Sequence, residues 1–180
     1  TIKGLVCRGY NLYSTKPYML SCPNLASIVF ERPRFCSLKP VLGANLVVLG
    51  LRNGTIKYDD LHHIINYSPN ISHMDISGCN IYKIGMRARS TPTPEHLRLK
   101  TLDISLLKLD TKFVFALLRN SGSTLQALYM YDSAVDDDNG NCAYDSLLKH
   151  CCALHTLSFS ISLDGEHWLK YVDLAVLGNI

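Results

Sequence analysis

Long hydrophobic runs are missing from this sequence of 180 residues. No apolar stretch approaches the roughly 18 residues of a membrane-spanning helix, so we expect a domain that does not enter a membrane. Charged residues make up 18% of the chain, below the quarter or so that is usual, and the net charge of +3 does not by itself favour nucleic acid. A hydrophobic content of 47% supports one substantial core, which predicts a single domain over residues 1–180.

Catalytic and cofactor signatures are absent as well. The sequence has no G-x-S-x-G, P-loop, G-x-G-x-x-G, H-E-x-x-H or EF-hand pattern, so we expect neither an enzyme nor a cofactor. The seven cysteines include no C-x-x-C pair, and an odd number without that spacing argues against zinc and against a disulfide framework. We therefore expect no bound metal and a reducing compartment, the cytoplasm or the nucleus.

One apolar pattern recurs along the whole chain. The pattern is L-x-x-L-x-L, with other apolar residues allowed in its three places, and it returns about every 20 to 30 residues. The seven matches are Ile2-Leu5-Cys7, Leu25-Ile28-Phe30, Leu46-Leu49-Leu51, Ile71-Met74-Ile76, Leu99-Leu102-Ile104, Leu125-Leu128-Met130 and Leu154-Leu157-Phe159. Seven matches without a long gap predict an α/β leucine-rich-repeat solenoid of about seven repeats.

Each match predicts a short strand whose apolar side chains point inward. Stacked repeats bury their open faces against one another, so we expect a parallel sheet on the concave face and mostly helical crossings on the convex face. Apolar spacing predicts these helices over residues 58–66, 110–120, 144–151 and 165–177. Pro40 and Gly43 predict an irregular crossing over residues 37–44.

Several segments that contain cysteine resemble a known family. They are Cys22-Pro23-Asn24-Leu25, Ser68-Pro69-Asn70-Ile71-Ser72-His73-Met74-Asp75-Ile76-Ser77-Gly78-Cys79 and His150-Cys151-Cys152-Ala153-Leu154. They resemble the cysteine-containing leucine-rich repeats of F-box proteins, and ribonuclease-inhibitor-like scaffolds have similar repeats. The resemblance implies a protein-binding domain, such as the substrate-receptor part of a cullin-type ubiquitin ligase.

This chain departs from the family pattern at the ninth position of the repeat. Only the fourth repeat has cysteine there, Cys79, whereas the second, third, fifth, sixth and seventh have Pro33, Gly54, Leu107, Ser133 and Ser162. The repeat also begins directly at the first residues of the chain, which predicts a fragment of a longer protein. Contacts with cullin-ligase components would then lie in sequence outside this chain.

The repeat alignment assigns the side chains that point away from the core. Between the second and third apolar positions, the outward row reads Val6, Val29, Gly50, Asp75, Asp103, Tyr129 and Ser158. After the third apolar position, it reads Arg8, Glu31, Arg52, Ser77, Ser105, Tyr131 and Ser160.

These rows predict a polarised surface that binds another protein. The candidate binding residues are Arg8, Arg32 and Arg52 in a basic amino-terminal third, and Asp75, Asp103, Tyr129, Tyr131 and Asp132 in an acidic and aromatic remainder. Tyrosine buries a large area at small entropic cost and supplies a hydroxyl. Tyr129 and Tyr131 are therefore the leading candidates for binding hot spots.

Two other functions fit parts of the sequence. Residues 83–98 contain three arginines and two prolines without helical periodicity. Together with the basic amino-terminal strands, they would suit an RNA-binding or nuclear RNA-export adaptor. However, no aromatic residues interleave with these arginines for base stacking. Sequons at Asn53, Asn66 and Asn70 would suit an extracellular, glycosylated, ligand-binding ectodomain.

Overall fold

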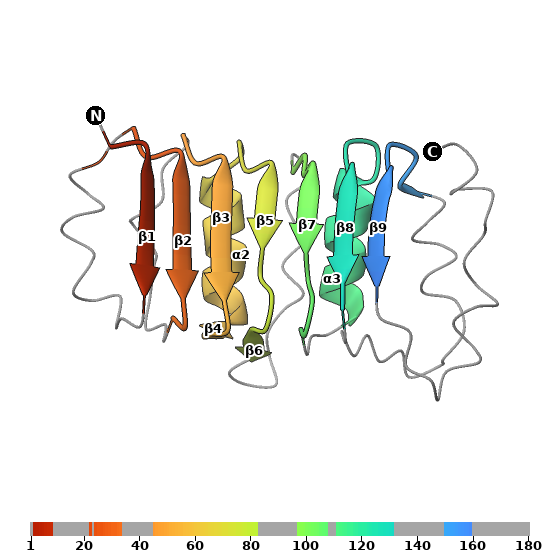
Figure 1. Ribbon diagram of the computed structural model, residues 1–180. Helices are drawn as coiled ribbons and strands as arrows, with labels where there is room; N and C mark the ends of the chain where they lie inside the picture. Colours follow the sequence, from red (N-terminus) through yellow and green to blue (C-terminus); the bar gives the residue numbers. More distant parts are fainter. Residues whose placement is uncertain are drawn as a thin grey trace.

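The fold is dominated by one parallel β-sheet. The computed structural model describes residues 2–8, 22, 24–33, 45–82, 97–107, 111–131 and 150–159. Seven strands of these residues form the sheet, namely β1 (Gly4–Arg8), β2 (Ser27–Glu31), β3 (Val48–Arg52), β5 (His73–Asp75), β7 (Thr101–Asp103), β8 (Ala127–Met130) and β9 (Thr156–Phe159). They lie side by side in the order of the chain (Figure 1). The expected α/β architecture with a parallel sheet of seven strands is confirmed.

The register of this sheet aligns the apolar positions of successive repeats. One row of paired residues runs across all seven strands through Leu5, Ile28, Leu49, Met74, Leu102, Leu128 and Leu157. From Ile28 to Leu128 the side chains of this row are almost completely buried. A slip of one residue in any strand would turn that strand's apolar side chains to the opposite face, so core burial specifies the register.

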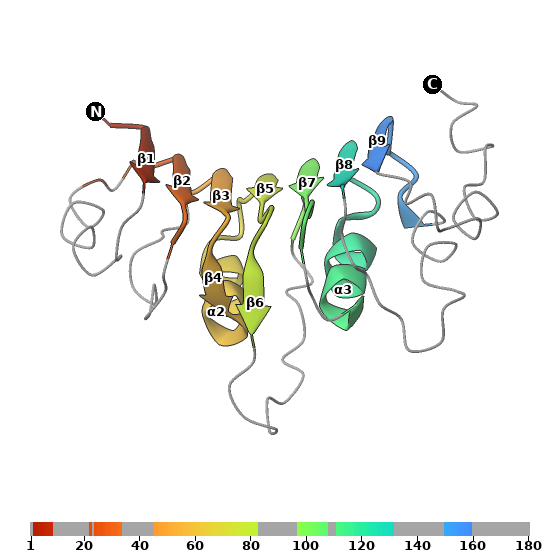
Figure 2. The same cartoon turned by 60° about the horizontal axis from the view of Figure 1, so that its bottom comes forward.

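Two helices cover one face of the sheet. They are α2 (Tyr58–Tyr67) and α3 (Thr111–Ser121), and Figure 2 shows both on the outer side of the shallow arc that the strands follow. Both helices were expected from the sequence, although Asp110, the first residue of the second expected range, lies outside the described residues. In the described part of the chain, no helix is both long and apolar enough to cross a membrane.

The core lies between the sheet and these helices. Leu61, Ile64 and Ile65 of α2 are buried, as are Leu117 and Leu118 of α3, because residues three and four apart share one face of a helix. Full burial of one such side chain stabilises the fold by about 1.5–3 kcal/mol. The crossings expected over residues 37–44 and 165–177, and nearly all of the one expected over 144–151, lie outside the described residues.

A second, two-stranded parallel sheet lies next to the carboxyl edge of the main sheet. It pairs β4 (Thr55–Lys57) with β6 (Asn80–Tyr82) (Figure 1). Ile56 at its centre is fully buried. This pair is not predictable from the sequence, because strands of three residues are too short to show an alternating pattern.

A left-handed turn recurs where four consecutive repeats leave the main sheet. Its residues are Arg32, Asn53, Gly78 and Leu106, with φ of 57°, 54°, 63° and 56°. Their N–H groups donate to the carbonyl oxygens of Arg52, Ser77, Ser105 and Tyr131, each in the next repeat. The backbone is therefore hydrogen-bonded between repeats beyond the strands themselves. This ladder fixes the positions of the side chains along the carboxyl edge of the sheet.

Candidate functional site

The face of the sheet opposite the helices is the candidate site. In the described part of the chain, both helices lie on the other side (Figure 2). The register joins Asp75 to Asp103 and Asp103 to Tyr129 on adjacent strands, so three of the residues predicted to bind a partner are direct neighbours. The outward row expected from the sequence is therefore a continuous row in the structure.

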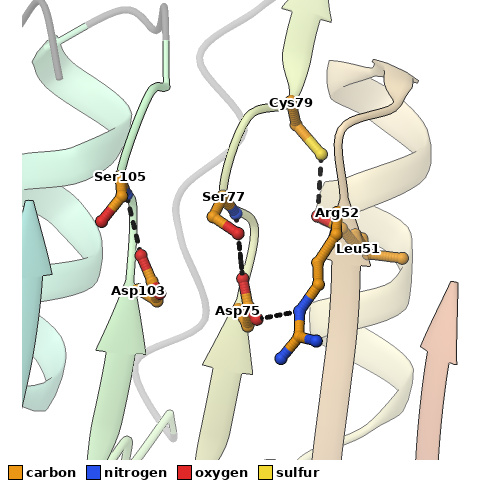
Figure 3. A network of polar contacts seen from close by, with 7 residues as sticks. All are labelled: Leu51, Arg52, Asp75, Ser77, Cys79, Asp103 and Ser105. Atoms are coloured by element: carbon orange, nitrogen blue, oxygen red, sulfur yellow. Dashed lines mark hydrogen bonds and ion pairs between the residues drawn. The ribbon is translucent and has the colours of Figure 1, made fainter. Parts of the chain in front are cut away.

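The amino-terminal half of this face carries charges that are paired with one another. Arg8 Nε lies 3.0 Å from Glu31 Oε2, and Arg52 Nε lies 2.5 Å from Asp75 Oδ2 (Figure 3). The hydrogen bond and charge of Asp75 raise the pKa of the Arg52 guanidinium above its ordinary value. The structure thus differs from the expected basic third, because carboxylates one strand away offset the charges of Arg8 and Arg52.

Arg32 does not belong to this row of charges. It occupies the left-handed turn after β2, where its N–H donates to the Arg52 carbonyl over 2.7 Å. The residue is exposed. Its backbone position is therefore determined by the turn, and the structure places it beyond the end of the strand.

Gly50 lies within the amino-terminal half of this face, between Val29 and Asp75 in the register. A Cβ atom at this position would lie only 2.9 Å from Val29 Cγ1, so the Val29 side chain occupies the space above the glycine. Gly50 is buried for this reason although it belongs to the outward row.

Two aspartates are held in the same way by serines two residues further on. Asp75 Oδ1 accepts hydrogen bonds from the Ser77 N–H at 3.1 Å and the Ser77 hydroxyl at 2.6 Å, and Asp103 Oδ1 accepts from the Ser105 N–H at 2.9 Å (Figure 3). These bonds fix both carboxylates. The difference is that Asp75 also pairs with Arg52, whereas within the described residues no cationic side chain pairs with Asp103.

The two tyrosines follow Asp103 on the next strand. Tyr129 is half-buried between Asp103 and Ser158 in the register. Tyr131 is 45% exposed, its N–H donates to Ser105 Oγ at 3.1 Å, and its hydroxyl is hydrogen-bonded to the Ser158 hydroxyl. Both tyrosines are thus placed in the acidic and aromatic half, whereas Asp132 lies outside the described residues.

Leu106 occupies the left-handed turn after β7, the position that Arg32 occupies after β2, and it is not among the residues selected from the sequence. Its side chain is 55% exposed, and its backbone is left-handed, with φ of 56°. Its N–H donates to the Tyr131 carbonyl at 2.5 Å, which places the residue beside Tyr131. The signal available in the sequence was its alignment with Asn53 and Gly78, because asparagine and glycine are the residues that most often occupy left-handed turns.

Two buried cysteines, Cys79 and Cys151, lie in surroundings that favour the protonated thiol. Cys79 Sγ donates to the Leu51 carbonyl at 2.8 Å (Figure 3), and burial raises the pKa of its thiol to about 11. Burial likewise raises the pKa of the Cys151 thiol to about 11. Both thiols are protonated at neutral pH and are poor nucleophiles. Cys79 instead links the turn of its repeat to the preceding strand.

Across the described ranges, no group of three or more His, Cys, Asp or Glu side chains is placed to hold a metal ion. Neither a scan against protein-family models nor a search of curated proteins found a match to the chain. A functional assignment therefore rests on the fold and on the chemistry of the exposed sheet face.

Proposed function

We propose that the chain is a leucine-rich-repeat module without enzymatic activity that recruits another protein through the concave face of its sheet. The observation that carries this proposal is the face of a continuous seven-stranded sheet that neither described helix covers, on which Tyr129 lies beside Asp103 and Tyr131 follows on the same side of that strand. Tyrosines next to a hydrogen-bonding group are typical of residues that dominate protein interfaces. The array of parallel strands also presents a surface of the size that a folded partner needs.

Three features support the assignment to leucine-rich repeats. The apolar pattern of the sequence coincides with the strand register, and a left-handed turn with an inter-repeat hydrogen bond follows four of the strands. The ninth position is buried at Pro33, Gly54, Cys79 and Leu107. All three features are expected of stacked leucine-rich repeats, because each repeat can bury its apolar side only against the neighbouring repeat.

The more specific proposal is that the chain is the substrate-receptor part of a cullin-type ubiquitin ligase. It is supported by the resemblance of the cysteine-containing segments to the repeats of F-box proteins, together with the hydrogen bond from Cys79 to the preceding repeat. Under this proposal, the exposed face binds the substrate, and cullin components bind sequence outside this chain.

The alternatives receive less support from the geometry. RNA binding needs cations that are available to phosphate, but Arg8 and Arg52 pair with carboxylates, and residues 83–96 lie outside the described part. An ectodomain would carry glycans, but Asn66 Nδ2 contacts His62 Nδ1 at 2.9 Å and Ser68 of the same sequon is fully buried. Asn53 and Asn70 are exposed, so they remain the sequons to examine.

Affinity purification of the native full-length protein from cell extract, with and without nuclease, tests the proposal. We expect a protein partner that survives nuclease treatment and also survives a rise in salt from 50 to about 200 mM, since binding to phosphates would weaken by powers of ten over such a range. Cullin and its adaptor among the recovered proteins would support the ligase proposal. Loss of all partners with nuclease, or glycan on Asn53 or Asn70, would contradict the proposal.

A further inference from the structure

Asp103, Leu106, Tyr129 and Tyr131 form one connected group, which we name the aromatic patch. Asp103 pairs with Tyr129 in the register, and Leu106 donates its N–H to the carbonyl of Tyr131. We propose that the aromatic patch binds a protein partner through an arginine or lysine side chain flanked by an apolar residue. This inference rests on the proposed function, since it specifies the chemistry of the partner that the sheet face takes.

The charge of the patch selects a cation. Asp103 is half-buried, and its Oδ1 accepts the Ser105 N–H, but in the described ranges it has no ion-pair partner. Its neighbour Asp75 differs because Arg52 already neutralises it. A partner's guanidinium or ammonium group would complete at Asp103 the pairing that Arg52 provides at Asp75.

The aromatic side chains favour the same ligand. Tyr129 lies next to Asp103 on the adjacent strand, so a cation held by the carboxylate would also lie within reach of a tyrosine ring. Such a ring attracts cations over its face, and arginine more often than lysine. The carboxylate fixes the charge of the ligand, and the ring adds a surface for its apolar stem.

Leu106 gives a second, independent reason to consider this patch functional. A bulky side chain in the left-handed region is uncommon, and asparagine or glycine occupies the equivalent turn after β3 and β5. Leu106 combines this backbone with a side chain that is 55% exposed, so neither local conformation nor core burial accounts for leucine here. An apolar contact with a bound partner does account for it.

A selection with a displayed library of random 12-residue peptides tests the proposal on the purified chain. We expect the recovered peptides to be enriched in arginine or lysine next to an apolar residue. The strongest binder is then synthesised with a fluorescent label, and its Kd is measured for the wild-type chain and for variants. A second peptide with glutamine in place of the cationic residue shows whether the charge is required.

Asp103→Asn is the informative variant, because asparagine Oδ1 can still accept the Ser105 N–H while the charge is lost. We expect it to raise the Kd of the cationic peptide at least about tenfold and to leave that of the glutamine peptide unchanged. Glu31→Gln is the matched control, since it removes a carboxylate from the same face at the Arg8 pair. The control should leave both Kd values unchanged.

Leu106→Asn separates binding from folding. Asparagine tolerates the left-handed region better than leucine, so the melting temperature should stay the same or rise, whereas we expect the Kd of the peptide to rise about fivefold or more. A variant that is at least as stable as the wild type but binds less tightly cannot be explained by unfolding.

Three results would overturn the proposal. A binder unaffected by Asp103→Asn and by Tyr131→Ala would place the binding surface elsewhere. A binder that needs Tyr131 but neither Asp103 nor a cation would refute the cationic ligand and leave the proposed protein-binding function standing. A library that yields no more binders on the wild type than on the Asp103→Asn, Tyr131→Ala double variant would also refute the cationic ligand. Failure of the proposed function would appear in a different experiment, as the absence of a nuclease-resistant partner of the full-length protein.

Discussion

The two halves of the exposed sheet face share one backbone register but differ in how their polar groups are used. In the amino-terminal half, Arg8 pairs with Glu31 and Arg52 pairs with Asp75, so the charges of these four residues sum to zero. In the carboxyl half, Asp103 lies beside Tyr129, and the exposed Leu106 is joined by a backbone hydrogen bond to the exposed Tyr131. An outward-facing position in a repeat is therefore a binding candidate only where its neighbours leave its charge or surface available.

Strand spacing explains the pairing in the amino-terminal half. Neighbouring strands lie about 4.8 Å apart, a distance that an arginine side chain spans easily, so an arginine at the end of one strand reaches a carboxylate on the next. Tyrosine and aspartate on neighbouring strands have no such attraction between opposite charges. Among the described residues, Asp103 therefore has no ion-pair partner.

Removal of an inward side chain should have the largest effect, because both halves rest on the same core. Leu128 and Ile104 are fully buried, and we expect Leu128→Ala or Ile104→Ala to lower the free energy of unfolding by about 2–5 kcal/mol, measured by urea denaturation. The control Val6→Ala removes a side chain that is 60% exposed and should change it by less than about 0.5 kcal/mol. Equal stability of Leu128→Ala and the wild type would refute the register.

Truncation of a tyrosine in the aromatic patch should have the next largest effect, and on binding only. We expect Tyr131→Ala to weaken binding of the native partner by about 1–3 kcal/mol, measured by titration calorimetry, without unfolding the domain. Arg8→Ala in the other half should leave the affinity nearly unchanged. If both variants weakened binding equally, the distinction between the halves would not hold.

Alkaline pH should lower stability through the buried thiols, which belong to neither half of the surface. Burial raises the pKa of Cys79 from 9.0 to about 11, so the unfolded chain ionises first as pH rises. This contribution is fully present below pH 9.0 and is lost between pH 9.0 and about 11. The loss is on the order of 2–3 kcal/mol at most, and Cys151 should behave similarly because its pKa is also about 11.

Urea denaturation at several pH values between 8 and about 11 measures this loss, and comparison with Cys79→Ala isolates one thiol from the other groups that titrate there. Cys79→Ala should be less stable than the wild type at neutral pH, because it loses the hydrogen bond to Leu51, but its stability should fall less steeply with pH. Parallel curves for the two proteins would show that the Cys79 thiol is not buried as described.

The smallest expected effect is that of the Arg8 and Glu31 pair. The Arg8 side chain is 78% exposed, and exposed ion pairs typically contribute 0–1 kcal/mol or so. Arg8→Ala should therefore change the free energy of unfolding by less than about 0.5 kcal/mol at 0.15 M salt. A loss above about 1 kcal/mol would mean that charge pairing in the amino-terminal half supports the fold as well as the surface.

Much of the fold could be predicted from the sequence, because its main determinant is periodic. The apolar triplets correctly predicted the seven strands of the main sheet, and the helical spacing predicted α2 and α3. The β4 and β6 pair was missed because each strand has only three residues. The left-handed backbone of Leu106 was missed because leucine carries no preference for that conformation.

The candidate site was predicted less completely. The outward rows follow from alternation along a strand, and they placed Asp75, Asp103 and Tyr129 next to one another as the structure has them. The same rows do not show in which direction a long side chain extends, so the pairing of Arg52 with Asp75 was not predicted. Prediction of which surface charges pair with one another therefore requires side-chain geometry as well as strand register.

The most direct test of the account is a comparison of two double variants of the full-length protein in one affinity purification. One carries Leu106→Asn and Tyr131→Ala in the aromatic patch, and the other carries Arg8→Ala and Glu31→Ala, which remove both members of an ion pair. Quantitative mass spectrometry of the nuclease-resistant partner should show at least about a tenfold loss with the first variant and near wild-type recovery with the second. Equal recovery with both, or loss only with the second, would contradict the account.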